Sequence, residues 1–434
     1  MDSITIGIIL AVLMLSLLAF GFWVSLSLMT VALVGVILYG SETYGLIFAS
    51  SAWSSSTSWS LAALPLFIWM GEILFRTRLA SDLFKGLTPW LGALPGRLLH
   101  VNILSCGLFA AVSGSSAATA ATVGKMTLPE LRARGYNERM SIATLAGSGT
   151  LGFLIPPSII LIVYGVAAEV SIARLFIAGA LPGLLLIVLF MAYTMIWSWL
   201  NKGGVDNSPD VRHSWKERLV ALRYLLPVLG LIGFVLGSIY GGFATTTEAA
   251  AVGVTGALIL ALLSGGLNRQ TFFDSLMGAV RTSCMIALIL VAAHFLTVAM
   301  AFLGIPRMLV GMIDALELSP MMLLVYLTIL FIILGCFLDG ISVVLLSTSI
   351  MLPMVAAAGI DLLWFGIYIV LVIEMAQITP PVGFNLFVLQ SLTGKNILYV
   401  ARAALPFFLL IGLAIVLISW FPEIVTALPA QMSR

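Results

Sequence analysis

Charged residues are scarce in this sequence. Asp, Glu, Lys and Arg make up only 9% of the 434 residues, whereas 61% are hydrophobic. A soluble domain cannot bury so much apolar surface, so the bilayer must be the solvent for most of the chain. The formal net charge of +2 leaves no excess of basic residues for nucleic acid. The composition therefore predicts a membrane protein without a nucleic-acid partner.

Cysteine is also rare. Cys106, Cys284 and Cys336 lie in apolar runs without the spacing of a disulfide framework or a metal motif, so we interpret them as small core residues. We expect no transition metal and no organic cofactor. The first apolar stretch follows three residues without a basic side chain or a convincing cleavage site, and we expect it to be a retained helix, not a signal peptide.

Three rare dipeptides recur in the same order at one fixed offset. The first set is Leu128-Pro129, Pro156-Pro157 and Leu181-Pro182, and the second is Leu352-Pro353, Pro380-Pro381 and Leu405-Pro406. Each residue of the second set lies 224 positions after its equivalent, as from Pro129 to Pro353. This pattern indicates a duplicated unit. Duplicated apolar segments, interrupted by Pro and Gly at matching positions, are typical of secondary transporters.

Each copy is expected to contain five spanning helices, because roughly 20 apolar residues cross a bilayer. The first copy, 1–201, has spans at about 4–19, 22–40, 61–77, 140–168 and 175–200. The second copy, 224–434, has spans at about 224–240, 247–265, 283–303, 362–392 and 403–421. The basic segment 202–223 is expected to be a cytoplasmic linker, and segments 81–93 and 305–317 to be interfacial helices. The predicted fold class is an all-α polytopic membrane protein.

Lys and Arg predict the orientation, because they accumulate in cytoplasmic loops. Two further apolar blocks, at about 98–128 and 321–358, have polar residues or glycine at their middle. If both blocks return to the side they enter from and the N-terminus is periplasmic, every Lys and Arg lies inside except Arg174, Arg307 and Arg434. Under this topology the two repeats are inverted.

The two interrupted blocks are predicted to be re-entrant hairpins. The first has the tip sequence SGSSAATAAT at 113–122, between limbs too short to span. Ser115 or Ser116 is expected to cap its second limb. The second has FLDGIS at 337–342, where Asp339 is a functional candidate and a suitable N-cap. The alternatives are a small-residue packing face in the first block and a capping acid without a ligand in the second.

Each copy continues with a span that is predicted to be broken. The sequences are LAGSGTLGFLIPPSII at 145–160 and IEMAQITPPVGFN at 373–385. Because proline favours the first turn of a helix, a helix is expected to end near Gly147 and a new one to start at the prolines. In the second copy Thr379 is the expected cap. The alternative is a proline kink in a continuous helix.

Four helix N-termini would then meet near the midplane, from two hairpin limbs and two post-proline halves. Their free N–H groups and partial positive charge suit an anion. Unwound carbonyls, Ser and Thr hydroxyls and Asp339 supply hard oxygen ligands that suit sodium. No Lys or Arg lies well inside a predicted span, so we expect helix ends and bound sodium to hold the anion.

Four further residues are ambiguous. Glu374 precedes the second break, where it either orients the unwound chain or couples to ions. Glu72 either snorkels from a helix end or has a function of its own, and Glu248 either complements a helix dipole or has a function of its own. His294 is either a satisfied core histidine or a relay residue.

Five segments resemble the large membrane subunit of TRAP (tripartite ATP-independent periplasmic) transporters, of the ion transporter superfamily. They are FAAVSGSSAATAATVG at 109–124, GTLGFLIPPS at 149–158, GGFATTTEAAAVG at 241–253, GIDLLWFGI at 359–367 and ITPPVGFNLFVL at 378–389. The resemblance covers nearly the whole chain. One departure is Thr246, where the family often has proline.

The resemblance implies a sodium-coupled importer, not an enzyme, in the inner membrane of a bacterium or archaeon. Hairpins and broken helices would form a moving elevator domain, and the other helices a scaffold. The implied substrate is an organic acid, such as a C4-dicarboxylate, sialic acid or another sugar acid. The implied partners are a small four-helix membrane subunit and a periplasmic substrate-binding protein.

The resemblance also implies site residues. One sodium ion would be held by the first tip and the first break, at Ser113, Gly114, Ser115, Gly147, Ser148, Gly149, Thr150 and Gly152. A second would be held at Asp339, Gly340, Ala376, Gln377 and Thr379. The substrate would lie between the tips, near Ser115, Ser116, Pro156, Pro157, Ser158, Ser342, Pro380, Pro381 and Asn385.

Two other functions compete with this one. A stand-alone sodium- or proton-coupled anion transporter of a related family would need no binding protein. An intramembrane serine hydrolase would use Ser113, Ser115 or Ser148 as nucleophile and His294 as base, although an inverted duplication has no role in such an enzyme.

Overall fold

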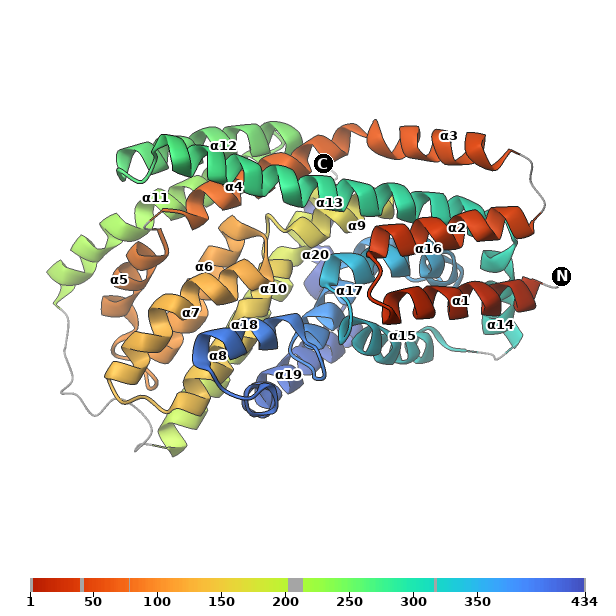
Figure 1. Ribbon diagram of the computed structural model, residues 1–434. Coiled ribbons are helices and arrows are strands. Elements are labelled where there is room, and N and C mark those ends of the chain that lie inside the picture. The colour runs from red at the N-terminus through yellow and green to blue at the C-terminus, as the bar shows by residue number, and fades with distance from the viewer. Residues whose placement is uncertain (1–2, 40–42, 78, 202–213, 316–317, 433–434) are drawn as a thin grey trace.

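The chain is helical throughout its described length. The computed structural model describes residues 3–39, 43–77, 79–201, 214–315 and 318–432, and every regular element in these ranges is a helix (Figure 1). The predicted all-α class is thereby confirmed. Of the predicted linker 202–223, residues 202–213 lie outside the described residues, and the rest belongs almost entirely to a helix that begins at Trp215.

The elements of the first copy follow the predicted order, with one unforeseen helix, α3. They are α1 (Ser3–Ala19), α2 (Val24–Leu38), α3 (Tyr44–Ser56), η1 (Trp59–Ala62), α4 (Ala63–Phe75), α5 (Leu79–Leu91), α6 (Leu98–Ser113), α7 (Ser116–Ala133), α8 (Glu138–Thr150), η2 (Leu151–Phe153), α9 (Ile159–Ala167) and α10 (Ile172–Leu200).

The second copy repeats this order and adds a short helix, α20, at its end. Its elements are α11 (Trp215–Tyr240), α12 (Thr246–Leu263), α13 (Arg269–Phe302), α14 (Ile305–Ala315), α15 (Pro320–Gly335), α16 (Gly340–Ala357), α17 (Leu362–Gln377), α18 (Phe384–Thr393), α19 (Ile397–Trp420) and α20 (Glu423–Gln431).

The duplication extends to the helix caps. Ser115 and Asp339 are the N-caps of α7 and α16, and Asn137 and Asp361 are those of α8 and α17. Each pair is separated by the same 224 residues as the proline dipeptides. Capping side chains satisfy the free N–H groups of a first turn, so matching caps start matching helices. One pair of elements differs, because the continuous α13 corresponds to α3 and η1–α4, which are bent by 56°.

The number of full-length spans is smaller than predicted. Among the described residues six helices are long and apolar enough to cross a membrane, and the bent pair α3 and η1–α4 would make a seventh. The predicted ten included α1 and α2, which have only 17 and 15 residues, and the two broken spans, each of which is split between two shorter helices. The chain is a multi-pass membrane protein, but ten full spans are not confirmed.

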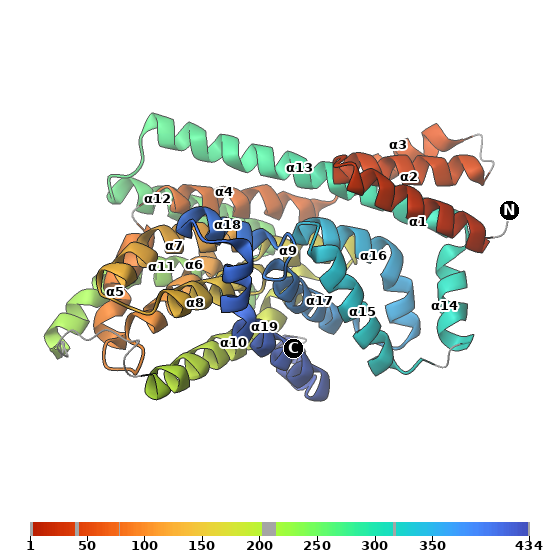
Figure 2. The ribbon, with the colours of Figure 1, turned by 60° about the horizontal axis from the view of Figure 1, so that its bottom comes forward.

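The helices form two groups. The long-helix layer contains α1–α4 and α11–α13, in which α13 packs along α2, α3 and α4 and α12 packs on α4. The inner bundle contains α6–α10 and α15–α20, and Figures 1 and 2 show it to one side of α13. The two groups touch where α13 packs on α16 and where α4 packs on α6 and α9.

The inner bundle holds the most deeply buried helices. In α17 every residue except Leu362 is buried, and in α8 every residue from Met140 to Thr150 is buried. By contrast, α12 buries only a stripe of small residues against α4 and α11. A helix that is apolar on all sides belongs in the centre of a large core. The predicted hairpins and broken spans therefore form the centre of the molecule.

Candidate functional site

The first hairpin turns at Gly114. Helix α6 ends at Ser113, and Gly114 adopts the left-handed conformation, with φ of +58°, that favours glycine at a helix C-terminus. Ser115 then caps α7, because its hydroxyl accepts a hydrogen bond from the Ala118 N–H at 3.4 Å. The hydroxyls of Ser113 and Thr119 lie 2.8 Å apart and join the two limbs. The predicted cap at Ser115 or Ser116 is confirmed as Ser115.

The second hairpin turns at Asp339. Its Oδ2 accepts hydrogen bonds from the N–H groups of Ile341 at 3.1 Å and Ser342 at 3.3 Å, and the Ser342 hydroxyl donates to Oδ1. The predicted N-cap role of Asp339 is confirmed. Oδ2 accepts two of these hydrogen bonds and Oδ1 accepts one, so Oδ1 keeps a lone pair with which Asp339 can also ligate a cation.

The first break interrupts α8 later than predicted. Helix α8 continues through Gly147 to Thr150, because the Thr150 hydroxyl donates to the Gly147 carbonyl at 2.8 Å and satisfies one of the last-turn acceptors. After η2, residues 154–158 are not helical. Helix α9 begins at Ile159, past the prolines, with Ser158 as its cap. The prediction that the new helix starts at the prolines was wrong by two residues.

The second break is built differently. Helix α17 ends at Gln377, residues 378–383 are not helical, and α18 begins at Phe384. The prediction that Thr379 caps the helix after the second break was wrong. Its hydroxyl donates backwards along the chain, to the Met375 carbonyl at 2.7 Å. The N-cap of α18 is Gly383, which makes no side-chain capping bond. Both spans are interrupted over several residues, so a simple proline kink is excluded.

Both hairpin tips contact the segment that forms the first break and the start of α9. A Cβ placed on Gly152 would lie 2.6 Å from the carbonyl oxygen of Ser115, so the break touches the first tip backbone to backbone. The Ile159 N–H donates to the Gly114 carbonyl at 3.3 Å. A Cβ on Gly340, at the second tip, would lie 2.8 Å from the side chain of Ile160. The start of α9 therefore lies between both tips.

The post-break helices exchange partners between the repeats. Helix α9, from the first copy, packs on α16 of the second hairpin, and α18, from the second copy, packs on α7 of the first hairpin. Asn385 at the start of α18 donates to the Ser116 hydroxyl at 2.5 Å. At the second tip, the Cys336 thiol donates to the Pro380 carbonyl at 3.5 Å. The N-termini of α7 and α18 are thus in direct contact.

The predicted sodium residues are only partly brought together. Gly152 contacts Ser115, and Gly149 packs on Ala120 of α7. A Cβ on Gly147 would collide with Phe407 of α19, while its carbonyl accepts from the Thr150 hydroxyl. The Ser148 hydroxyl donates within its own helix, to the Thr144 carbonyl at 2.6 Å. In the second copy Ala376 faces Gly335, and Gln377 is buried with its Nε2 unpartnered among the described residues.

The predicted substrate residues differ in access. Pro156, Pro157 and Ser158 are buried, whereas Pro380 and Pro381 are exposed. Asn385 is buried, and its Oδ1 has no hydrogen-bond partner in the described part of the chain. A buried acceptor without a partner is costly and is a candidate contact for a ligand. Ser115, Ser116 and Asn385 form one group, while Ser342 lies at the second tip with Asp339.

A buried polar network that we did not predict clamps the first hairpin. Asn102 of α6 donates to the Thr144 hydroxyl of α8 at 3.0 Å and accepts from the Thr127 hydroxyl of α7 at 2.9 Å. All three side chains are buried. An amide within the apolar run of α6 was the available signal, because such a side chain needs partners from neighbouring helices.

The structure gives each of the four ambiguous residues a partner. Glu248 forms a capping box with Thr245, which is a structural role at the helix N-terminus. Glu72 pairs with Arg76 at 3.2 Å on the same helix. His294 contacts the Ser54 hydroxyl at 3.1 Å, and not one of the three serines of the hydrolase hypothesis. Glu374 is fully buried and accepts a hydrogen bond from Thr150 of the other repeat at 3.3 Å.

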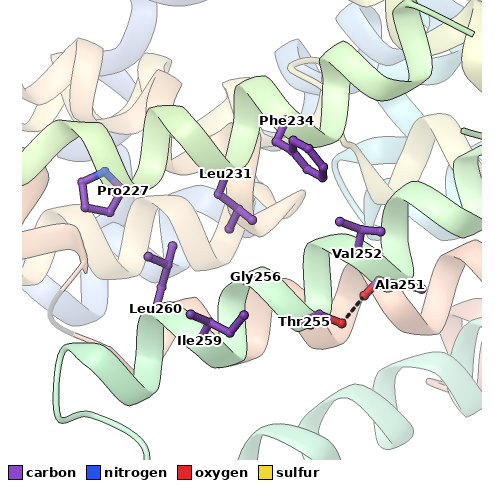
Figure 3. Close-up of a pocket in the computed structure, with 9 residues that line it drawn as sticks. All are labelled: Pro227, Leu231, Phe234, Ala251, Val252, Thr255, Gly256, Ile259 and Leu260. Carbon is purple, nitrogen blue, oxygen red and sulfur yellow. Dashed lines mark hydrogen bonds between the residues drawn. The ribbon is translucent and has the colours of Figure 1, made fainter. Parts of the chain in front are cut away.

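Two polar cavities adjoin the hairpins. One, of about 780 Å³, lies between α7, α8 and the α18–α19 connection, where Glu138 pairs with Arg132 at 2.6 Å and Lys395 at 2.8 Å. Another, of about 690 Å³, lies between α3, α13, α16 and the α9–α10 connection. A third cavity, between α11 and α12, is apolar, and its one hydroxyl, on Thr255, donates to Ala251 (Figure 3). The third cavity offers nothing to an anion.

The oxygen donors at the tips fit a sodium ion. A hard cation prefers carbonyl, hydroxyl and carboxylate oxygens. The close approach of Gly152 to Ser115 brings the first break against the Ser115 carbonyl, and Asp339 supplies a carboxylate at the second tip. The donors at the two tips therefore have the chemistry that sodium needs.

Known proteins match this chain along nearly its full length. The family model "Tripartite ATP-independent periplasmic transporter, DctM component" matches residues 11–424. The chain is 34% identical to the C4-dicarboxylate TRAP transporter large permease protein DctM of Pseudomonas aeruginosa, over 88% of each chain. It is 32% identical to the ectoine/5-hydroxyectoine TRAP transporter large permease protein UehC of Ruegeria pomeroyi, over 95% of this chain and 96% of that one.

A longer relative and a solved structure also match. The isethionate TRAP transporter permease protein DctMQ of Oleidesulfovibrio alaskensis is 33% identical over 92% of this chain, which spans only 63% of that relative's length. The crystal structure of the Alcanivorax borkumensis YdaH transporter shares the fold, with a TM-score of 0.64, 14% identity and coverage of 95% of this chain and 97% of that one. The chain belongs to the DctM family, the large membrane subunits of tripartite ATP-independent periplasmic transporters.

Proposed function

We propose that this subunit takes up a small organic acid by sodium-coupled secondary active transport. The observation that carries the proposal is the convergence of both hairpin tips on the start of α9, where oxygen donors and helix N-termini gather without a Lys or Arg. Positive helix ends suit an acid group, and hard oxygen ligands suit sodium.

The first sodium site would use backbone carbonyls at the first tip and first break. Ser115 and Gly152 are the best supported members, because their backbones touch. The second site would use Asp339 with the unwound chain after Gln377, which the Cys336–Pro380 contact holds against the second tip. Bound sodium would supply positive charge beside the acid group of the substrate.

The substrate would bind between the first tip and α18. Ser116 and Asn385 offer a hydroxyl and an unpartnered buried carbonyl at the contact of two helix N-termini. The relatives are named for isethionate, ectoine and C4-dicarboxylate, compounds that share a compact acid-bearing structure. We therefore propose a small organic acid, with sialic acid and other sugar acids as further members of the class.

Transport would proceed by an elevator movement. The inner bundle carries both tips and both breaks, and we propose that it moves against the long-helix layer as a unit. The separation of the helices into two groups supports this division, as does the mainly small, apolar surface that α12 presents to its neighbours. The matching helix order of the two copies is compatible with inverted repeats, in which opposite packing states have similar energies.

The subunit would lie in the inner membrane, with its N-terminus in the periplasm, and would work with two partners. A small four-helix membrane subunit would complete the permease, and a periplasmic binding protein would deliver the substrate. The family assignment supports this arrangement over a stand-alone anion transporter. Against the serine hydrolase, His294 contacts Ser54 in the long-helix layer, away from Ser113, Ser115 and Ser148.

Uptake into proteoliposomes tests the proposal. The chain is reconstituted with its small membrane subunit, and uptake of candidate organic acids is measured with an inward sodium gradient, with and without the binding protein. We expect uptake only when both sodium and the binding protein are present. Uptake by the chain alone would instead establish the stand-alone transporter, and sodium-independent uptake would contradict sodium coupling.

A further inference from the structure

Two equivalent residues of the repeats contact each other. Thr150 ends α8 in the first copy, and Glu374 lies 224 positions later, near the end of α17. The Thr150 hydroxyl donates to Glu374 Oε2 at 3.3 Å, and both side chains are fully buried. Residues at equivalent positions touch each other only where the two copies come face to face. This contact therefore lies at the junction of the repeats, beside both breaks.

The Thr150 hydroxyl has two acceptors but only one proton. It lies 2.8 Å from the Gly147 carbonyl and 3.3 Å from Glu374 Oε2. A hydroxyl donates one hydrogen bond, so the two acceptors compete for it. The shorter distance favours the Gly147 carbonyl. A cation bound to that carbonyl would weaken it as a hydrogen-bond acceptor and shift the hydroxyl towards Glu374.

A second pair of polar groups, within α17, links Glu374 to the second break. Glu374 Oε1 and Gln377 Nε2 are buried and have no hydrogen-bond partner among the described residues. They are three residues apart on one helix, a spacing that puts side chains on the same face. One group is an acceptor and the other a donor. A change of rotamer would let them bond to each other and would fix the side chain of Gln377 beside the second break.

We propose that Thr150 and Glu374 couple the two sodium sites, an inference that rests on the proposed function. Gly147 belongs to the predicted first site and Gln377 to the second. When the Gly147 carbonyl ligates sodium, the Thr150 hydroxyl turns to Glu374, and Glu374 then orients Gln377. Filling the first site thereby raises the affinity of the second. Thr150 and Glu374 are positioning residues, because they act through the carbonyl and the amide of other residues.

Sodium titration of thermal stability tests this coupling without relying on uptake. The permease is purified in detergent, and its melting temperature is followed as sodium replaces choline at constant ionic strength, because a ligand of the folded state raises that temperature. Wild type is expected to show a cooperative titration. Thr150→Val keeps the shape but removes the hydroxyl. It should lose the cooperativity and shift the midpoint about fivefold or more to higher sodium concentrations.

Matched variants separate coupling from structural damage. Thr150→Ser restores the hydroxyl and should restore cooperative binding. Thr194→Val removes an equally buried hydroxyl that donates only to the Phe190 carbonyl of its own helix, and it should titrate like wild type. Glu374→Leu should resemble Thr150→Val, and the double variant should be no worse than either single one, since both changes remove one link.

The outcomes distinguish this inference from the function on which it rests. A stability titration with no sodium response in wild type, together with sodium-independent uptake, would overturn the proposed function and the coupling with it. A sodium response that is non-cooperative in wild type, or one that stays cooperative in Thr150→Val, would overturn the coupling alone. Additive effects in the double variant would likewise show that Thr150 and Glu374 act separately.

Discussion

The two Pro-Pro breaks share the proline pair and its place in the repeat but have opposite surroundings. In the first, Pro156 and Pro157 are buried, and the hydroxyl of Ser158 caps the following helix. In the second, Pro380 and Pro381 are exposed, and Gly383 starts the following helix without a side-chain cap. The first break is buried by its own residues and by a hairpin tip. The contacts around the second break leave part of it exposed.

This difference separates what a repeat encodes from what its environment supplies. Both copies provide a proline pair, a capped hairpin limb and an interrupted helix, so the duplicated sequence is sufficient for the break itself. Exposure depends instead on which other helices lie over it. Under the proposed elevator movement such a difference is expected in each state, because only one side of the site would be open at a time.

The largest expected effect is at Gly152, where the first break touches the first tip. Gly152→Ala places a Cβ 2.6 Å from the backbone of Ser115, and backbone cannot move aside as a flexible side chain can. We expect a loss of about 1–3 kcal/mol in stability and near-complete loss of uptake. Melting temperature in detergent and uptake in proteoliposomes measure the two effects.

In the second break the equivalent position already has alanine, because Ala376 lies 224 residues after Gly152. Gly230→Ala on α11, where a Cβ would meet nothing within 4 Å, is the matched control and should behave as wild type. A Gly152→Ala variant as stable and active as wild type would show that the first tip and the first break are not packed tightly. The two breaks would then not differ in packing.

The next largest effect concerns access. Phe384 is 50% exposed at the start of α18, whereas Ile160, its equivalent in α9, is fully buried. With the native cysteines replaced by alanine, Phe384→Cys should react with an aqueous maleimide at least about tenfold faster than Ile160→Cys, because reaction requires exposure of the thiolate. Equal rates at the two positions would mean that the breaks do not differ in access.

Asp339→Asn tests the charge at the second tip. Asparagine caps a helix about as well as aspartate, so α16 should keep its start while the site loses a charged oxygen ligand. We expect the sodium concentration for half-maximal uptake to rise about tenfold, which corresponds to about 1.4 kcal/mol. Ser115→Asn, at the equivalent cap of the first tip, is the companion variant. An unchanged sodium dependence in Asp339→Asn would remove Asp339 from the ion site.

The smallest expected effect is that of the cap in the first break. Ser158→Ala removes the hydroxyl that accepts the Leu161 N–H and donates to the Phe153 carbonyl. Loss of such a cap costs about 0.5–2 kcal/mol, which should appear as a modest drop in melting temperature. Gly383→Ala is no equivalent test, because Gly383 has a φ of +43° and little space around it. A Ser158→Ala variant as stable as wild type would mean that tertiary packing alone holds the first break closed.

The sequence by itself determined the features that act over a few residues. Composition predicted the membrane environment, the 224-residue offset predicted the duplication, and Ser115 and Asp339 were correct as caps because capping depends on the next three residues. The same local reasoning failed where a hydroxyl had a choice of partners. Thr379 bonds backwards to Met375, and Thr150 extends α8 past Gly147.

Only the tertiary structure decided how the copies combine. The packing of α9 on α16 and of α18 on α7, the Asn385–Ser116 bond and the Thr150–Glu374 contact each join segments about 180 to 270 positions apart. Local propensity carries no information about such pairs, because they form when two copies of one unit pack face to face. The physical reason is that burial, unlike capping, is a property of the surrounding helices, so of two proline pairs at equivalent positions one is buried and the other is exposed.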